Sequence, residues 1–113
     1  MPLKRNKTLE KIFRKYNRMY FDNKLRLPDE LFFKSNLKAN GESVDAYVEE
    51  CIDGEVRMVV DEDYKRHDAI LRLIVLHEMA HIATGIINEE MHNLRWGAEI
   101  NRLYHAGAYD KLL

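Results

Sequence analysis

Apolar side chains recur at helical spacing near the start of the chain. Over residues 8–21 they occupy every third or fourth position, and this pattern predicts an amphipathic helix. The apolar positions are Leu9, Ile12, Phe13, Tyr16 and Tyr20. Asn6 or Thr8 can accept hydrogen bonds from the first free N–H groups of this helix, and Asp22-Asn23 followed by Pro28 ends it.

Three short apolar runs follow and predict strands over residues 31–36, 45–52 and 55–60. Asp53-Gly54 lies between the last two runs. This dipeptide favours a tight hairpin turn whose two central residues both take positive φ angles. An edge strand of that hairpin is expected beside the functional cleft.

Two further helices are predicted in the C-terminal half. The polar segment 61–68 leads into the first of them, and Gly85 ends it in a left-handed conformation. The last helix is expected over residues 92–105, with Trp96, Ile100 and Leu103 turned inward and Tyr104 in the core. The order helix, three strands, helix, helix predicts an α+β domain with a small three-stranded antiparallel sheet.

The composition adds limits to this picture. A chain of 113 residues with 46% hydrophobic and 33% charged residues fits one globular domain. Its longest apolar stretch, residues 69–83, is interrupted by charged and histidine side chains, so no membrane span is expected. The single cysteine, Cys51, excludes an internal disulfide. With no signal-peptide pattern at the start, these features favour a cytoplasmic monomer.

Charge is unevenly distributed along the chain. Residues 1–26 hold nine Lys and Arg against two Asp and Glu, whereas residues 27–113 hold nine against seventeen. A basic segment can contact a polyanion. The solvated face of an amphipathic helix explains the same residues more simply, so only weak nucleic-acid contact is expected through residues 1–26.

The residues that point to chemistry are His77-Glu78-Met79-Ala80-His81. Residues four apart on a helix project from one face, so His77 and His81 can both reach one Zn²⁺ ion. Glu78 lies beside them, where a carboxylate can act as general base toward an activated water and as general acid toward a leaving amine. Buried imidazoles and a buried carboxylate are costly without such partners.

A catalytic zinc ion commonly takes three protein ligands and leaves a position for water. Three downstream residues compete for the third place, namely His92, Glu99 and His105. Their spacing from His81 leaves the choice open. Tyr104 and His105 could also reach the oxyanion of a tetrahedral intermediate, although packing of Tyr104 in the core and capping of the last helix by His105 explain them more simply.

Four separated segments, in order, resemble the SprT-like metalloproteases, the family that includes Spartan. The first is the run Asn17, Tyr20, Phe21, Leu25 and Pro28, the second is the hairpin that follows it, and the last two are residues 76–81 and the pair His92 and Trp96. This resemblance implies a zincin-like fold and makes His92 the third zinc ligand. The family often has a glycine after that histidine, where this chain has Asn93. A second resemblance, to the small zincins called minigluzincins, would favour Glu99.

The sequence therefore predicts a zinc metallopeptidase that hydrolyses peptide bonds of a polypeptide substrate. Its Zn²⁺ ligands would be His77, His81 and His92, and its catalytic residue would be Glu78. The alternative is a non-catalytic, metal-stapled module that contacts DNA or protein through its basic N-terminal helix, or a latent protease whose cleft is covered by residues 107–113.

Overall fold

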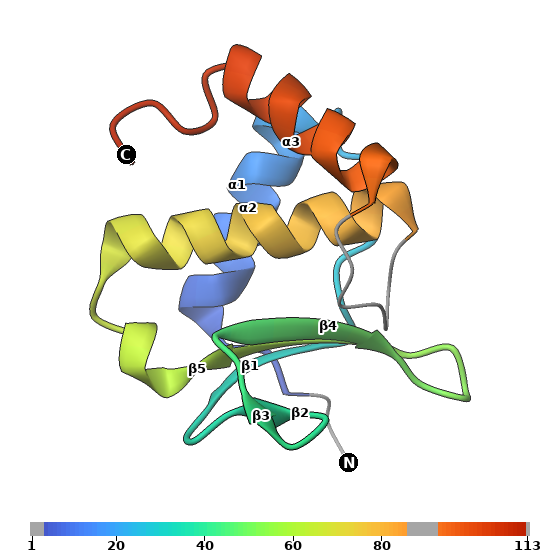
Figure 1. Ribbon diagram of the computed structural model, residues 1–113, viewed down its shortest axis with the longest axis vertical. Coiled ribbons are helices and arrows are strands. Elements are labelled where there is room, and N and C mark those ends of the chain that lie inside the picture. The colour runs from blue at the N-terminus through green and yellow to red at the C-terminus, as the bar shows by residue number, and fades with distance from the viewer. Residues whose placement is uncertain (1–3, 86–92, 113) are drawn as a thin grey trace.

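Three α-helices lie over one face of a small sheet in the part of the chain that the computed structural model describes, residues 4–85 and 93–112 (Figure 1). In chain order the elements are α1 (Lys7–Tyr20), β1 (Glu30–Lys34), β2 (Lys38–Ala39), β3 (Glu42–Ser43), β4 (Ala46–Glu50), β5 (Val56–Asp61), the 3₁₀ turn η1 (Glu62–Tyr64), α2 (Asp68–Thr84) and α3 (Leu94–His105). Both α1 and α2 contact the sheet, and α3 contacts α2. The predicted α+β class is confirmed.

Helix α1 forms where its apolar spacing predicts it. The side chain of Asn6 is its cap, because Oδ1 accepts the N–H groups of Thr8 and Leu9 at 2.9 and 3.1 Å. The buried face consists of Leu9, Ile12, Phe13 and Tyr16. The opposite face is exposed and basic, and it carries Lys7, Lys11, Arg14, Lys15 and Arg18. These cations lie where an amphipathic helix meets solvent.

The sheet is mixed, so the prediction of a purely antiparallel sheet is wrong. Its strand order is β1-β5-β4, with β1 parallel and β4 antiparallel to β5. The chain leaves β1 through the β2–β3 hairpin and enters β4 in the opposite direction, and β5 then inserts between the two. Side-chain alternation is the same in parallel and antiparallel strands, so the sequence held no signal for this direction.

The β4–β5 hairpin is confirmed, but its turn differs from the expected one. The N–H of Gly54 bonds to the carbonyl of Cys51 at 2.8 Å, and Cys51 N–H bonds to the carbonyl of Glu55 at 2.7 Å. Gly54 has a positive φ of 87°, whereas Asp53 does not. The loop is therefore one residue longer than a two-residue turn, and only its glycine needs the left-handed conformation.

Helix α2 is apolar on more than one side. Leu71, Val75, Leu76 and Met79 belong to the buried core, and Gly85 ends the helix with a φ of 73°, as predicted. Among the described residues, no helix has both the length and the apolar character needed to cross a bilayer.

Helix α3 begins at Leu94, two residues later than predicted. Asn93 is its cap, since Oδ1 accepts the Trp96 N–H at 3.0 Å. Leu103 is fully buried and Ile100 is half-buried, in agreement with the predicted inward face. Tyr104 is 58% exposed, so its predicted place in the core is wrong. A helix of this length buries only one stripe, and Tyr104 follows the buried Leu103 by one position.

The loop after α1 is held by the side chain of Asn17, the first residue of the SprT-like pattern. Its Nδ2 donates to the Leu25 carbonyl at 2.9 Å, and its Oδ1 accepts the Leu25 N–H at 3.1 Å. Between Asn17 and Leu25 along the chain, Asp22 and Asn23 both have positive φ angles, of 53° and 58°. Two consecutive left-handed residues are unfavourable unless their surroundings fix them. The Asn17 amide therefore has a structural role in this turn.

We expect Asn17→Ala to lower the free energy of unfolding by about 1–3 kcal/mol, because two partly buried backbone groups lose their hydrogen bonds. Urea denaturation measures the change. Asn101→Ala is the matched control, since Asn101 is exposed on α3, and it should change stability by no more than about 0.5 kcal/mol. Equal stability of the two variants would contradict the role given to Asn17.

Candidate active site

The two histidines of the motif lie one helical turn apart on α2. Their ring centroids are 5.1 Å apart and the ring planes are inclined by 63°. His81 is buried, with 6% of its surface exposed, whereas His77 is half-buried at the rim of the helix. The structure thus brings together the two residues that the sequence singled out as metal ligands.

This separation is the one expected for two imidazoles that share a tetrahedral zinc ion. A Zn–N bond of about 2.0–2.1 Å places the ion roughly 3.2 Å from each ring centre, so two rings at a tetrahedral angle are about 5 Å apart. The donor set fits zinc in kind as well, because neutral imidazole nitrogens are common zinc ligands. His77 and His81 are therefore suited to hold the ion.

Trp96 from α3 packs against both imidazoles. Its ring centroid lies 4.9 Å from that of His77 and 5.6 Å from that of His81. The indole N–H also donates to the backbone carbonyl of His77 at 3.4 Å. The indole restricts the rotation of the two histidine side chains, so the pair is held partly in place by α3. Trp96 was expected to face inward, and its side chain is half-buried.

Glu78 is the third polar residue of the group and has only 6% of its surface exposed. Burial disfavours the ionised carboxylate and raises the pKa of Glu78 to about 8. A cation held by the neighbouring histidines would stabilise the ionised form and lower this pKa again. The carboxyl group is thus placed where it can exchange a proton near neutral pH.

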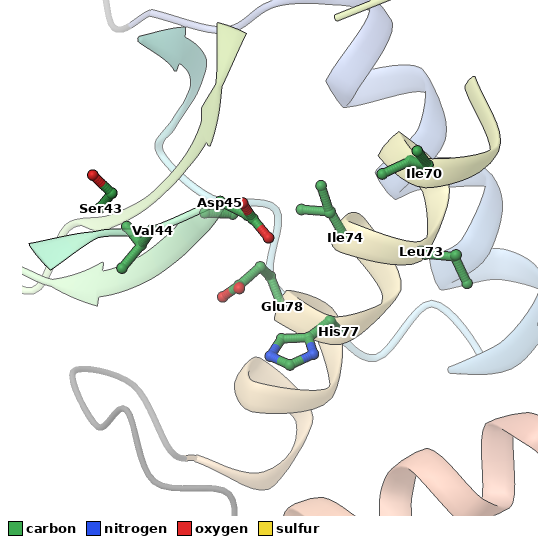
Figure 2. A pocket seen from close by; sticks show the side chains of 9 residues that line it. Ser43, Val44, Asp45, Ile70, Leu73, Ile74, His77 and Glu78 are labelled. Carbon is green, nitrogen blue, oxygen red and sulfur yellow. The ribbon is translucent and has the colours of Figure 1, made fainter. Parts of the chain in front are cut away.

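A cleft of about 420 Å³ opens between α2 and the start of β4 (Figure 2). We call it the strand-side pocket. It is lined by residues 43–46 and, from α2, by Ile70, Leu73, Ile74, His77 and Glu78. Strand β4 pairs with β5 and, among residues 4–85 and 93–112, is an edge strand of the three-stranded sheet. The expected edge strand beside the cleft is therefore present.

A second cleft of about 540 Å³, the helix-side pocket, lies between α2 and α3. Its walls are mainly aromatic and aliphatic, and they are formed by Leu73, His77, Trp96, Gly97, Ile100, Asn101, Tyr104 and Tyr109. Leu73 and His77 line both pockets, so these two residues form the ridge between them. Because Tyr109 is among these residues, the segment that follows α3 forms part of the wall of this second pocket.

The predicted third ligands lie in different places. His92 is outside the described residues. The Glu99 carboxylate bonds to the Arg102 guanidinium on α3, with Arg102 Nε donating to Oε1 at 2.8 Å. His105 is exposed at the end of α3, and its ring contacts Tyr104. Within residues 4–85 and 93–112, no three His, Cys, Asp or Glu side chains gather in a way that could hold a metal ion.

Two parts of the site were not predicted from the sequence. Asp45 lines the strand-side pocket, and its Oδ1 accepts a hydrogen bond from the Tyr64 hydroxyl at 2.6 Å. Tyr109 lines the helix-side pocket, where it joins Tyr104, which was expected in the core. These residues belong to no motif, and only the packing of β4, η1, α3 and the C-terminal segment around α2 brings them to the clefts.

Comparisons of this chain with models of known protein families, with curated proteins and with solved structures found no match. The likeness to SprT-like proteases therefore rests on the motif residues themselves.

Proposed function

We propose that this chain is a zinc-dependent metallopeptidase with a zincin-like fold of the SprT-like kind. The observation that carries the proposal is a buried carboxyl group, Glu78, beside a pair of imidazoles, with Glu78 and His77 both lining an open cleft. Each group alone has ordinary explanations. Together they supply the metal ligands and the proton carrier that hydrolysis of an amide needs.

His77 and His81 would hold the ion, and His92 is the third ligand that the motif pattern implies. Zinc bound at such a site supplies Lewis acidity, which activates water and polarises a carbonyl group. The engagement of Glu99 with Arg102 favours His92 over the glutamate alternative, because a ligating Glu99 would have to give up that ion pair. Trp96 holds the two imidazole rings in orientation.

Glu78 carries the proton in the proposed reaction. Its carboxylate accepts a proton as water attacks the carbonyl carbon of the scissile bond, and it then donates that proton to the departing amine nitrogen. Burial favours the protonated form of this carboxyl group and a cation bound beside it would favour the ionised form, so the site supports both states that the two steps need. The water oxygen ends in the new carboxyl group, and the C–N bond is broken.

The substrate would be an extended polypeptide. Strand β4 is an edge strand of the sheet in the described part of the chain, and a peptide can add to a sheet edge through backbone hydrogen bonds. A chain that follows this edge passes the ridge of Leu73 and His77, with one pocket on each side. Its side chains can enter the pockets while one peptide bond lies at the histidine pair.

The burial of Glu78 also separates this proposal from a metal-stapled binding module. A purely structural zinc site needs no carboxyl group beside its ligands, and burying one lowers stability. Perturbed carboxyl groups in clefts concentrate at catalytic sites. The exposed basic face of α1 is explained by its contact with solvent, so it adds no separate reason for a nucleic-acid partner.

The purified protein should bind about one zinc ion per chain, and His77→Ala or His81→Ala should weaken that binding by more than about 100-fold. Each variant loses a direct zinc ligand, whereas loss of a residue that only hydrogen-bonds to a ligand lowers metal affinity by about 10–100-fold. Fluorescence of Trp96, the only tryptophan, reports the titration because its ring lies against both histidines. His67→Ala is the control, since His67 is exposed before α2. Unchanged zinc affinity in His81→Ala would refute the metal site.

A separate pair of variants tests the third ligand. We expect His92→Ala to weaken zinc binding far more than Glu99→Gln, since Glu99 is already paired with Arg102. Zinc content after dialysis and Trp96 fluorescence both measure the difference. The opposite order of the two effects would identify Glu99 as the ligand.

Glu78→Gln should retain zinc and fold but lose peptide-bond cleavage by at least about 10²–10⁴-fold, because glutamine has the same shape and cannot accept the proton. Cleavage of unfolded proteins, followed by mass spectrometry with zinc present, measures the loss. Glu62→Gln, which changes an exposed carboxylate on η1, should cleave like the wild type. Equal cleavage by wild type and Glu78→Gln would mean that a contaminating protease is responsible.

A further inference from the structure

We propose that the strand-side pocket selects a basic residue, lysine or arginine, next to the bond that is cleaved, and that Asp45 is the residue that recognises it. This inference rests on the proposed peptidase function, because it names the substrate class of the same site. It is carried by the chemistry of the pocket walls, which are acidic on one side and aliphatic on the other.

Asp45 supplies the acidic wall. It lies directly before β4 and projects toward α2, with Ile74 opposite it across the cleft (Figure 2). The Tyr64 hydroxyl donates to its Oδ1 at 2.6 Å and fixes the orientation of the carboxylate. Among the described residues, no cation forms an ion pair with Asp45, so this exposed carboxylate can receive a cation from a ligand.

The negative potential around this carboxylate is reinforced by its neighbours. Tyr64 has a raised pKa, chiefly because of its hydrogen bond to Asp45 and further because of burial and the nearby charges of Asp45, Asp61 and Asp63. Two cations of the adjoining elements, one directly after η1 and one on α2, are engaged in other contacts. Arg72 pairs with Asp68 at 3.1 Å, and the Lys65 ammonium lies over the Phe33 ring at 5.8 Å from its centre.

Helix α2 supplies the aliphatic wall. Ile70, Leu73 and Ile74 line the pocket, and Ile70 is 45% exposed although it is a large apolar residue. Lysine and arginine combine an apolar stem with a charged end, so they cover apolar surface and reach an acid at the same time. A purely aliphatic side chain would offer Asp45 no cation, and an acidic one would be repelled.

The location of the pocket determines which substrate residue it binds. His77 and Glu78 line it together with Asp45, so a side chain bound there belongs to a residue close to the scissile bond. The proposed enzyme therefore cleaves beside basic residues of an extended chain.

Peptides that differ at one position test this preference. The matched set carries lysine, norleucine or glutamate at that position in an otherwise neutral sequence, because norleucine keeps the stem of lysine and lacks its ammonium group. Binding is measured by fluorescence anisotropy with zinc-loaded Glu78→Gln, which does not cleave the peptides. The same measurement is made with two double variants. The first combines Glu78→Gln with Asp45→Asn, which keeps a hydrogen-bond acceptor for Tyr64. The second, the control, combines Glu78→Gln with Asp22→Asn, which removes the same charge at an exposed position that lines neither pocket.

The lysine peptide should bind about twofold to fivefold more tightly than the norleucine peptide, as expected for a partly exposed ion pair. Asp45→Asn should abolish this difference, and Asp22→Asn should leave it intact. Equal binding of the two peptides, tighter binding of norleucine, no binding of any peptide, or a preference that persists in Asp45→Asn would overturn the proposal.

Cleavage is measured separately with zinc-loaded wild type on the same peptides. Lysine-selective binding that depends on Asp45, without any cleavage, would retain the basic pocket and overturn the peptidase function. Cleavage that ignores the lysine would retain the peptidase function and overturn the pocket.

Discussion

The packing of α2 against the sheet is the contact on which the candidate site depends. Leu71, Val75 and Met79 are buried in the core, and this fixes the rotation of the helix about its axis. With that rotation fixed, the face that carries His77 points to the two clefts, Glu78 is buried but still lines the strand-side pocket, and His81 is buried behind His77 on the same helix. A helix that rotated by one residue would lose both the core packing and the site.

Burial of Glu78 is the energetic consequence of this arrangement. The carboxyl group is 6% exposed, and desolvation raises its pKa to about 8, so the unliganded fold is less stable than it would be with an apolar residue there. Nearby Met79 and Leu76 show that α2 accepts apolar side chains at such depths. A residue that lowers stability at a position where an apolar side chain would fit is typical of a functional group.

Much of the fold followed from the sequence, since local patterns determine local elements. The spacing of Leu9, Ile12 and Phe13 identified α1, and Gly85 identified the end of α2. What the sequence lacked was information about nonlocal pairing. The parallel pairing of β1 with β5 joins residues such as Leu31 and Met58, which are far apart in the chain, and no local pattern encodes its direction.

The site shows the same division between local and nonlocal information. His77, Glu78 and His81 could be singled out because helical geometry alone brings them together. Asp45 and Tyr109 reach the clefts only through tertiary packing, from opposite sides of the ridge that Leu73 and His77 form. The two sides therefore differ in chemistry, one with an acidic rim and the other mainly aromatic and aliphatic. A peptide bound across this ridge would meet different pockets at its two ends, so the clefts themselves can determine the direction in which it binds.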